Sequence, residues 1–529
     1  MNNITDVLPV TFLAQMRELL GSEFDAFKAG YSQPSRRGLR FNRLKCDFLP
    51  ALDTQASPVS LNPAFGTLAP VPWCKEGYEY PPDARPGKSI LYNAGLYYIQ
   101  EPSAMSPAAI LRPEPGQRVL DICAAPGGKS VQLAGYMHGG AGRIPSAEAH
   151  FPSSRGVLVS NDISPSRSRA LVKNLEMAGV TNAIVLTENP HRLAERFADY
   201  FDCILVDAPC SGEGMFRRDP DAAKAYTANK PESCGAMQQE ILRHAAKMLK
   251  PGGRLVYSTC TFNTLENEDA VAAFLVAHPD FKLLPIDHEG LEVSRGRDAR
   301  GYTARIWPHT SSGEGHFIAL MQKAGNVDSH TQSLRCEAGQ ASNDTPSLRG
   351  KAEAIQGYGT RGYPQSPPTE RANNTRERAD NARTACRLPE EFVAFCNENL
   401  HPPAFTDPNL IIHRHNNSLF LQPENIDLTG LRVARSGWLL GECTKGRFVP
   451  SQALAMGIGK SQARYVIDLP ELEAQRYLKG ESLTPDDWPG KSALGKPWVL
   501  VCYSGLPLGW ARLVQGRLKN QLPTSWVVS

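Results

Sequence analysis

A regular alternation of short apolar runs with helical stretches, between residues 118 and 260, constrains the fold of this chain more than any other feature. The apolar runs at 118–123, 156–162, 183–187, 201–207 and 254–260 predict buried β-strands. The stretches between them predict helices, for example at 166–178 and at 237–249, where Pro251-Gly252-Gly253 follows. Such alternation indicates a parallel sheet with right-handed crossovers. We therefore expect an α/β fold at the centre of the chain.

The segments next to this sheet predict an appendage before it and a hairpin at its end. Residues 8–30 have apolar positions at helical spacing, and a basic turn and a Pro- and aromatic-rich stretch follow. We expect residues 1–105 to form a small α+β appendage and residues 106–323 to form the sheet domain. Within that domain, the apolar runs 304–307 and 316–321 predict an antiparallel edge hairpin.

The composition changes abruptly after the sheet domain. Residues 324–387 are rich in Ser, Thr, Asn, Gln, Arg, Gly and Pro and poor in aliphatic side chains. Because such a segment buries too little apolar area to fold, we expect a disordered linker there. Residues 388–529 contain short apolar runs broken by turns, which predicts a smaller β-rich domain.

Composition excludes several classes of protein. No stretch approaches the roughly 20 apolar residues of a membrane helix, and the first residues do not resemble a secretory signal. The 12 cysteines form no C-x-x-C pair, which argues against a structural zinc site and a disulfide scaffold, so we expect no metal and a cytoplasmic protein. The net charge of +3 neither demands nor excludes a nucleic-acid partner.

A loop rich in small residues joins the first predicted strand to a helix. Paired glycines let a backbone pass close to a ligand, and the helix N-terminus offers free N–H groups. The loop lacks both G-x-G-x-x-G and the Walker pattern, which disfavours a dehydrogenase and an ATPase. A tight turn that binds nothing is the alternative. The candidate cofactor-binding residues of this segment are Cys123, Ala124, Ala125, Pro126, Gly127, Gly128 and Lys129.

Polar residues at the ends of the next two strands are further cofactor candidates. Asp162 ends the second predicted strand, where a carboxylate can accept both hydroxyls of a ribose. An aspartate that caps the helix beginning near Ser164 is the alternative. Asn189 follows the third strand and is a candidate contact for an adenine edge.

Two cysteines follow closely on the last two parallel strands. Cys210 lies in D-A-P-C-S-G-E-G and Cys260 lies in Y-S-T-C-T. Ligands of open α/β sheets bind at the carboxyl ends of strands, so two thiols there suggest covalent chemistry. A cysteine near a strand is more often a small buried hydrophobic residue, and we assign that packing role to Cys203.

These motifs together resemble the Nol/Nop/Sun family of RNA cytosine-C5 methyltransferases. The resemblance lies in D-I-C-A-A-P-G-G-K, D-A-P-C-S-G-E-G and Y-S-T-C-T, covers residues 1–323 and extends more loosely to the C-terminal part. Within the family the chain is most similar to RsmF-like bacterial ribosomal RNA methylases. The resemblance implies a Rossmann-like sheet that binds S-adenosyl-L-methionine, and a C-terminal PUA-like RNA-binding domain.

The resemblance also implies a role for each site residue. Cys260 would add to C6 of cytosine, and Cys210 would assist the later elimination. Asp207, which we count as both a catalytic and a cofactor-site residue, could hydrogen-bond the polar edge of the base. Lys129 could contact the base or the methionine carboxylate.

Reaching a cytosine requires contacts to RNA, because a stacked base cannot present C6 to a thiolate. Tyr97 and Tyr98 are candidates for stacking on bases, with core packing the alternative for one of them. A solvated surface charge is the alternative for each arginine. The candidate phosphate contacts are Arg36, Arg37, Arg40, Arg217 and Arg218, with Lys445, Arg447, Arg517 and Lys519 in the C-terminal part.

The function that we expect is methylation of cytosine C5 in RNA, with 16S ribosomal RNA favoured as the substrate. One alternative is a transfer RNA cytosine-C5 methyltransferase, because the motifs do not separate the two RNA classes. Another is a non-catalytic RNA-binding factor for ribosome assembly. We expect a monomer whose partner is RNA, with neither a membrane nor DNA as a partner.

Overall fold

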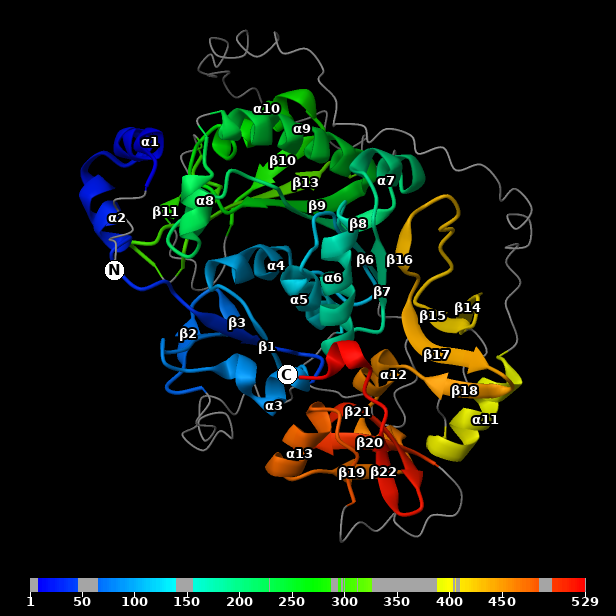
Figure 1. Cartoon of the computed structure of the whole chain (residues 1–529). Helices are drawn as coiled ribbons and strands as arrows, with labels where there is room; N and C mark the ends of the chain where they lie inside the picture. The colour runs from blue at the N-terminus through cyan, green and yellow to red at the C-terminus, as the bar shows by residue number, and fades with distance from the viewer. Residues whose placement is uncertain are drawn as a thin grey trace, which may run out of the picture.

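The computed structural model describes residues 8–45, 65–138, 156–227, 229–286, 294–295, 298, 300–311, 313–325, 388–402, 405, 410–484 and 497–528. The predicted disordered linker, 324–387, lies outside the described residues except at its first two positions. Figure 1 shows the chain as an N-terminal part, a central sheet covered by helices on both faces, and a C-terminal β-rich part.

The N-terminal part combines two helices with a small antiparallel sheet. Helix α1 spans Val10–Leu20 and α2 spans Phe24–Gly30, as the helical spacing predicts. Phe12 and Phe27 from these helices pack in a cluster that also contains Trp307 of the central part. The sheet has the order β2 (Ala69–Val71), β3 (Cys74–Glu79), β1 (Gly38–Phe41) and β4 (Tyr97–Ile99).

The central sheet has five parallel strands, and each lies close to a predicted run. Their order across the sheet is β7, β6, β5, β8, β9, so successive strands are added toward one edge up to β7 and toward the other edge from β8 on. A reversal of this kind creates the crevice in which α/β proteins bind ligands. The strands are β5 (Arg118–Asp121), β6 (Val157–Asn161), β7 (Ala183–Leu186), β8 (Phe201–Asp207) and β9 (Leu249–Thr259).

Helices cover both faces of this sheet because its strands are buried on both sides. Successive residues of β5 point in opposite directions: Val119 packs with Leu171, whereas Leu120 packs with Ile241. Each face therefore has its own core, which helices cover (Figure 1). One face carries α4 (Ser106–Leu111), α5 (Gly128–Met137) and α6 (Pro165–Met177), and the other carries α7 (Pro190–Arg196), α9 (Lys230–Met248) and α10 (Glu268–Ala277).

The structure confirms the α/β prediction and corrects one helix. Helix α9 begins at Lys230, earlier than predicted, and ends at Met248. The Pro-Gly-Gly stretch that follows lies inside β9, where the pairing with β8 jumps from Leu249 to Arg254. The intervening residues form a bulge in the strand instead of a separate turn.

The predicted antiparallel hairpin forms, although it is not simply an edge. β13 (His316–Lys323) pairs with β9 on one side and with β12 (Ala304–Ile306) on the other. β11 (Ser294–Arg295) continues the sheet beyond β12, and β10 (Phe281–Leu284) also pairs with β13. Thus β13 places its first residues beside the end of β9.

The C-terminal part contains two four-stranded sheets where the sequence predicts one β-rich domain. Helix α11 (Glu390–Asn399) and α12 (Gln452–Gly457) lie with the first sheet, and α13 (Glu471–Leu478) contacts β20 of the second. The first sheet has β14 (Ile411–His415), β15 (Ser418–Gln422), β17 (Trp438–Thr444) and β18 (Arg447–Pro450), and the second has β19 (Val466–Asp468), β20 (Trp498–Tyr503), β21 (Leu506–Val514) and β22 (Arg517–Asn520).

One strand from the C-terminal part joins the central sheet, which the sequence does not predict. β16 (Val433–Arg435) pairs antiparallel with β7, and Figure 1 shows it beside that strand. The buried Arg435 donates to the carbonyl of Val180 at 3.0 Å. Glu188, fully buried just after β7, accepts from the backbone of Arg432 at 2.6 Å.

Candidate functional site

Two sulfur atoms meet at the carboxyl ends of β8 and β9. These strands pair in parallel with Asp207 opposite Ser258, so the loops that follow them leave the sheet side by side. Cys210 and Cys260 lie on these loops, with their Sγ atoms 3.3 Å apart and both side chains half-buried. The register of the two strands thus brings together the two thiols that the sequence singles out.

The environment of Cys210 differs from that of an ordinary thiol. Its hydrogen bond with Cys260 and its burial raise the pKa of Cys210 well above the usual value. Cys210 therefore keeps its proton at neutral pH, and either sulfur atom can be the donor in the contact between the two thiols.

A buried polar cluster fixes the two cysteine loops to each other. Glu213 accepts from the backbone of Phe262 at 2.8 Å, and Glu266 accepts from the backbone of Ser211 at 2.9 Å. The amide of Asn263 donates to both carboxylates, at 3.2 Å and 2.7 Å. All three polar side chains are nearly inaccessible to solvent. Each loop is therefore held by a carboxylate that the other loop supplies.

Asp207, at the end of β8, is the charged centre of the site. Its Oδ2 lies 2.8 Å from the ammonium of Lys129, and its Oδ1 accepts from the hydroxyl of Ser258 at 2.8 Å. Burial alone would raise the pKa of Asp207, but the charge of Lys129 keeps it well below the usual value. Asp207 is thus a carboxylate, able to accept hydrogen bonds from a ligand.

Lys129 forms the other half of this ion pair. Although burial alone would lower its pKa, the charge of Asp207 raises the pKa of Lys129 above its usual value. The lysine therefore stays charged beside the carboxylate. It connects the first turn of α5 to the end of β8, at the point where the strand order of the sheet reverses.

The glycine loop, residues 124–129, leads into α5 with an open helix end. Gly127 precedes the helix with a φ of 114°, which favours glycine, and no side chain caps the first turn. The first N–H groups of a helix have no partner inside it, so they are available to an anionic group such as a carboxylate. A Cβ on Gly128 would lie 3.0 Å from the ring of Tyr98, so the loop is enclosed on its far side.

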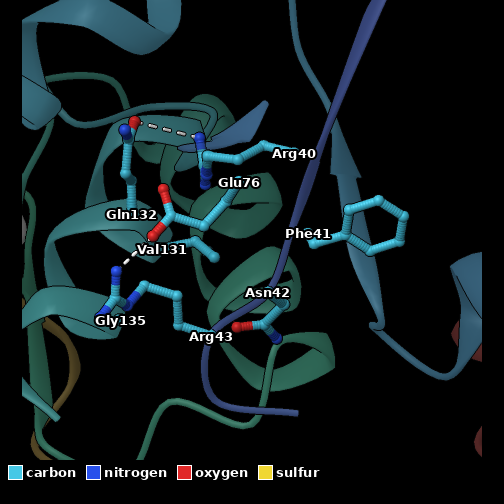
Figure 2. A pocket seen from close by; sticks show the side chains of 8 residues that line it. All are labelled: Arg40, Phe41, Asn42, Arg43, Glu76, Val131, Gln132 and Gly135. Atoms are coloured by element: carbon cyan, nitrogen blue, oxygen red, sulfur yellow. Dashed lines mark hydrogen bonds and ion pairs between the residues drawn. The ribbon is translucent and has the colours of Figure 1, made fainter. Parts of the chain in front are cut away.

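Arg40 supports this loop from the N-terminal sheet and is not a phosphate contact. Its guanidinium is buried and donates to the carbonyl of Gly128 at 2.7 Å and to Gln132 at 3.2 Å. Figure 2 shows Arg40 pointing toward Gln132 across a hollow between β1 and α5. In the same view Arg43 is bonded to Glu76. Arg40 therefore links the N-terminal part to the start of α5.

Asp162 and Asn189, the predicted contacts for ribose and adenine, both accept hydrogen bonds from the backbone. Asp162, almost fully buried, accepts from the backbone of Ala125 at 3.3 Å and of Ser164 at 3.0 Å. It therefore lies against the glycine loop and also stabilises the turn before α6. Asn189 accepts from the backbone of His191 at 2.8 Å, which makes it the cap of α7.

Cys123 and Cys203 differ in their surroundings. Cys123 is half-buried near Asp121, and burial together with that carboxylate raises its pKa well above the usual value. Cys203 is fully buried in the core, in agreement with its predicted packing role.

The structure divides the candidate RNA contacts into exposed and buried residues. Arg217, like Arg40, is wrongly predicted as a phosphate contact, because it is buried and paired with Glu314 at 2.6 Å. Tyr97 is buried and bonded to Pro86, whereas Tyr98 is half-buried beside the glycine loop. The exposed candidates are Arg36, Arg37, Arg218, Lys445, Arg447, Arg517 and Lys519.

Several residues of the site escape the sequence analysis. Glu213 follows Cys210 in its motif, so its position was a usable signal. Asn263 and Glu266 lie in an ordinary polar stretch after Cys260, which carries no such signal. Asp121 is fully buried at the end of β5, and burial raises its pKa to about 7. His316, on β13, comes from the predicted hairpin and lies near Asp207.

Two further features of the described residues bear on function. None of the helices there is long and apolar enough to cross a membrane. Groups of three or more metal-ligating side chains are likewise absent from the described part of the chain.

Four family models match successive parts of the chain. The model described as 16S rRNA methyltransferase RsmB/F matches residues 108–322, and the N-terminal domain of 16S rRNA methyltransferase RsmF matches residues 8–102. The first C-terminal domain of RsmF rRNA methyltransferase matches residues 394–458, and the RsmF PUA domain matches residues 464–528. The last two matches correspond to the two C-terminal sheets.

Known proteins are similar over most of the chain. Ribosomal RNA small subunit methyltransferase F of Erwinia tasmaniensis is 30% identical, covering 98% of this chain and 96% of the relative. The protein of the same name from Escherichia coli strain SE11 is also 30% identical, with coverages of 99% and 97%. The crystal structure of PH0851 aligns with a TM-score of 0.52 and 25% identity, over 61% of this chain and 69% of that chain.

The parallel sheet, its glycine loop and these matches define the class of protein: this is an S-adenosylmethionine-dependent RNA methyltransferase. Within that class, the chain belongs to the RsmF family of 16S ribosomal RNA methyltransferases, because the similarity extends over nearly the full length of both chains.

Replacing Asn263 should separate the two cysteine loops. Asn263→Ala leaves two buried carboxylates without their shared donor, so we expect a loss of about 3 kcal/mol in the free energy of unfolding. We also expect a short bifunctional thiol reagent to bridge Cys210 and Cys260 more slowly. Urea unfolding and mass spectrometry measure the two effects. Asn417→Ala, at an exposed position, is the control. Unchanged bridging would show that the loops do not depend on Asn263.

Proposed function

We propose that this protein methylates C5 of a cytosine in 16S ribosomal RNA, with Cys260 as the covalent nucleophile. The observation that carries the proposal is the pair of sulfur atoms 3.3 Å apart, next to the Asp207–Lys129 ion pair. Membership of the RsmF family supports the RNA class, and the names of the relatives specify the small ribosomal subunit.

A thiolate is needed because C5 of cytosine is a poor nucleophile. When Cys260 adds to C6, the electron pair of the C5–C6 double bond makes C5 nucleophilic. S-adenosylmethionine, when bound, supplies the methyl group that C5 takes up. Loss of the C5 proton to a base and cleavage of the sulfur–C6 bond then restore the double bond and free Cys260. Dividing one difficult step into covalent steps lowers the barrier to each.

The remaining site residues have roles that follow from their contacts. Cys210 keeps its proton in the resting site, so it can support the charge on Cys260 and take part in the elimination. Asp207 is a carboxylate that can accept from the amino group of the base. Lys129 holds Asp207 in place at 2.8 Å.

The same crevice has groups that suit the donor. The free N–H groups in the uncapped first turn of α5 can donate to its methionine carboxylate, and Asp162 can accept from its ribose hydroxyls. Asn189 would meet the adenine from the end of β7. Cys123 and residues 124–128 would contact the donor through the loop backbone.

The two cysteines should give opposite results when each is replaced. Cys260→Ala removes the nucleophile, so we expect no methyl transfer and no covalent RNA adduct. Cys210→Ala leaves the attack possible but slows the release, so we expect a protein–RNA complex that survives a denaturing gel. Radiolabelled donor and gel electrophoresis measure both.

Cys234→Ala is the matched control, because Cys234 is a half-buried thiol on α9 outside the cysteine loops. We expect it to behave as the wild type. If the Cys260 and Cys210 variants behaved alike, the proposed division of roles would be wrong.

The target RNA can be identified in a deletion strain. We expect bisulfite sequencing to show loss of 5-methylcytosine from 16S ribosomal RNA, with transfer RNA unchanged. Loss from transfer RNA alone would favour a transfer RNA methyltransferase. Complementation by the Cys260→Ala variant, with ribosome assembly restored, would favour a non-catalytic assembly factor.

We also propose that the C-terminal part binds RNA backbone through exposed cations. Lys445 and Arg447 flank a turn between β17 and β18, whereas Arg517 and Lys519 lie on β22. None of the four is buried. Cations in such positions can contact phosphates, and each phosphate contact releases counterions.

Replacing these four cations by alanine should weaken binding of 16S ribosomal RNA and reduce its dependence on salt. The slope of log K against log salt should fall by about 0.7 to 0.9 for each phosphate contact that is lost. Filter binding between low and moderate salt measures the slope. Alanine at the exposed Lys247 and Lys282 of the central part is the control. An unchanged slope would contradict a role for the four cations.

A further inference from the structure

His316 lies opposite the reactive cysteine, across an antiparallel strand pair. β13 and β9 pair with Phe317 opposite Thr259, so His316 begins β13 where the chain leaves β9 toward Cys260. Ile318 pairs with Ser258 in the same ladder. Since side chains alternate along a strand, His316 lies on the same face as Ser258, whose hydroxyl donates to Asp207.

The imidazole of His316 is buried with both ring nitrogens unsatisfied. The residue is 4% exposed, and within the described structure neither nitrogen has a hydrogen-bond partner. Its Nε2 lies 3.5 Å from Oδ1 of Asp207, slightly beyond a normal hydrogen bond. Buried polar atoms without partners are rare and costly, so this one requires an explanation.

The contacts of Asp207 show what the histidine can add. Lys129 holds Oδ2, and Ser258 donates to Oδ1. A hydroxyl rotates and can also accept, whereas an imidazole Nε2 that carries a proton can only donate. Hydrogen bonds in active sites are often long before the ligand binds and shorten in the complex. His316 is therefore placed to become the second donor to Oδ1 when a base occupies the site.

We propose that His316 is a positioning residue that orients the Asp207 carboxylate toward the cytosine, by donating from Nε2 to Oδ1. This inference rests on the proposed function. His316 acts through Asp207 and needs no contact with the base itself. Removing its donor lets the carboxylate turn away from the polar edge of the cytosine.

The test compares single-turnover methyl transfer to 16S ribosomal RNA by the wild type, His316→Phe and His316→Gln. The phenylalanine fills the space without a donor, and the rate should fall about tenfold, as expected for one lost hydrogen bond to a charged group. Glutamine offers an amide donor at a similar reach and should restore the rate to within about threefold of the wild type. If His316 acted by packing alone, glutamine would not restore a rate that phenylalanine had lowered.

The same substitution made in a second variant shows whether His316 acts through Asp207 or independently of it. Ser258→Ala removes the other donor to Oδ1 of Asp207. His316→Phe should therefore lower the rate of methyl transfer by a clearly larger factor in the Ser258→Ala variant than in the wild type. The effects of two substitutions that remove contacts to the same atom are not additive. An equal loss of rate in the wild type and in the Ser258→Ala variant would overturn the inference. So would a His316→Phe variant as fast as the wild type, or a His316→Gln variant as slow as His316→Phe.

Two measurements keep the outcomes distinct. His278→Phe, at the end of α10, is the control and should retain the wild-type rate. Calorimetric binding of the donor to each variant shows that the site is folded. If the wild type itself transferred no methyl group to C5, the proposed function would fail. A wild type that methylates C5 while His316→Phe remains equally fast would contradict only the role of His316.

Discussion

The contact between Lys129 and Asp207 is the interaction on which the site depends. It joins the first turn of α5, and with it the glycine loop, to the end of β8, from which the Cys210 loop departs. Each member keeps the other charged in a place where burial alone would favour neutrality. The glycine loop and the loop that carries Cys210 are consequently joined by one buried ion pair.

Around this unit the molecule uses buried polar groups where an ordinary core would use aliphatic ones. Glu213, Glu266 and Asn263 hold the thiol loops together, and Arg40 secures α5 from the N-terminal sheet. Buried groups of this kind are costly unless every partner is present, so they favour one arrangement over many. The precision of the 3.3 Å sulfur contact follows from that selectivity.

The sequence predicts the central fold and the site motifs well, because both depend on local patterns. Apolar runs locate β5 to β9, and the end of each strand locates Asp162, Asp207, Cys210 and Cys260. Asn263 and His316 escape because their roles arise from the pairing of distant strands. Arg40 and Arg217 are wrongly predicted to be at the surface, since a sequence does not show that an arginine has buried acceptors. The sequence analysis also misses β16, because its partner β7 is far away in the chain.

The pairing of β16 with β7 has a mechanical consequence. One strand of the C-terminal part is hydrogen-bonded to the edge of the central sheet, and Arg435 and Glu188 add further hydrogen bonds between the two parts. The distance between the C-terminal cations and the sulfur of Cys260 is therefore set by the fold. Under the proposed function, this fixed distance would limit which cytosines can reach Cys260 while the C-terminal part holds the RNA backbone.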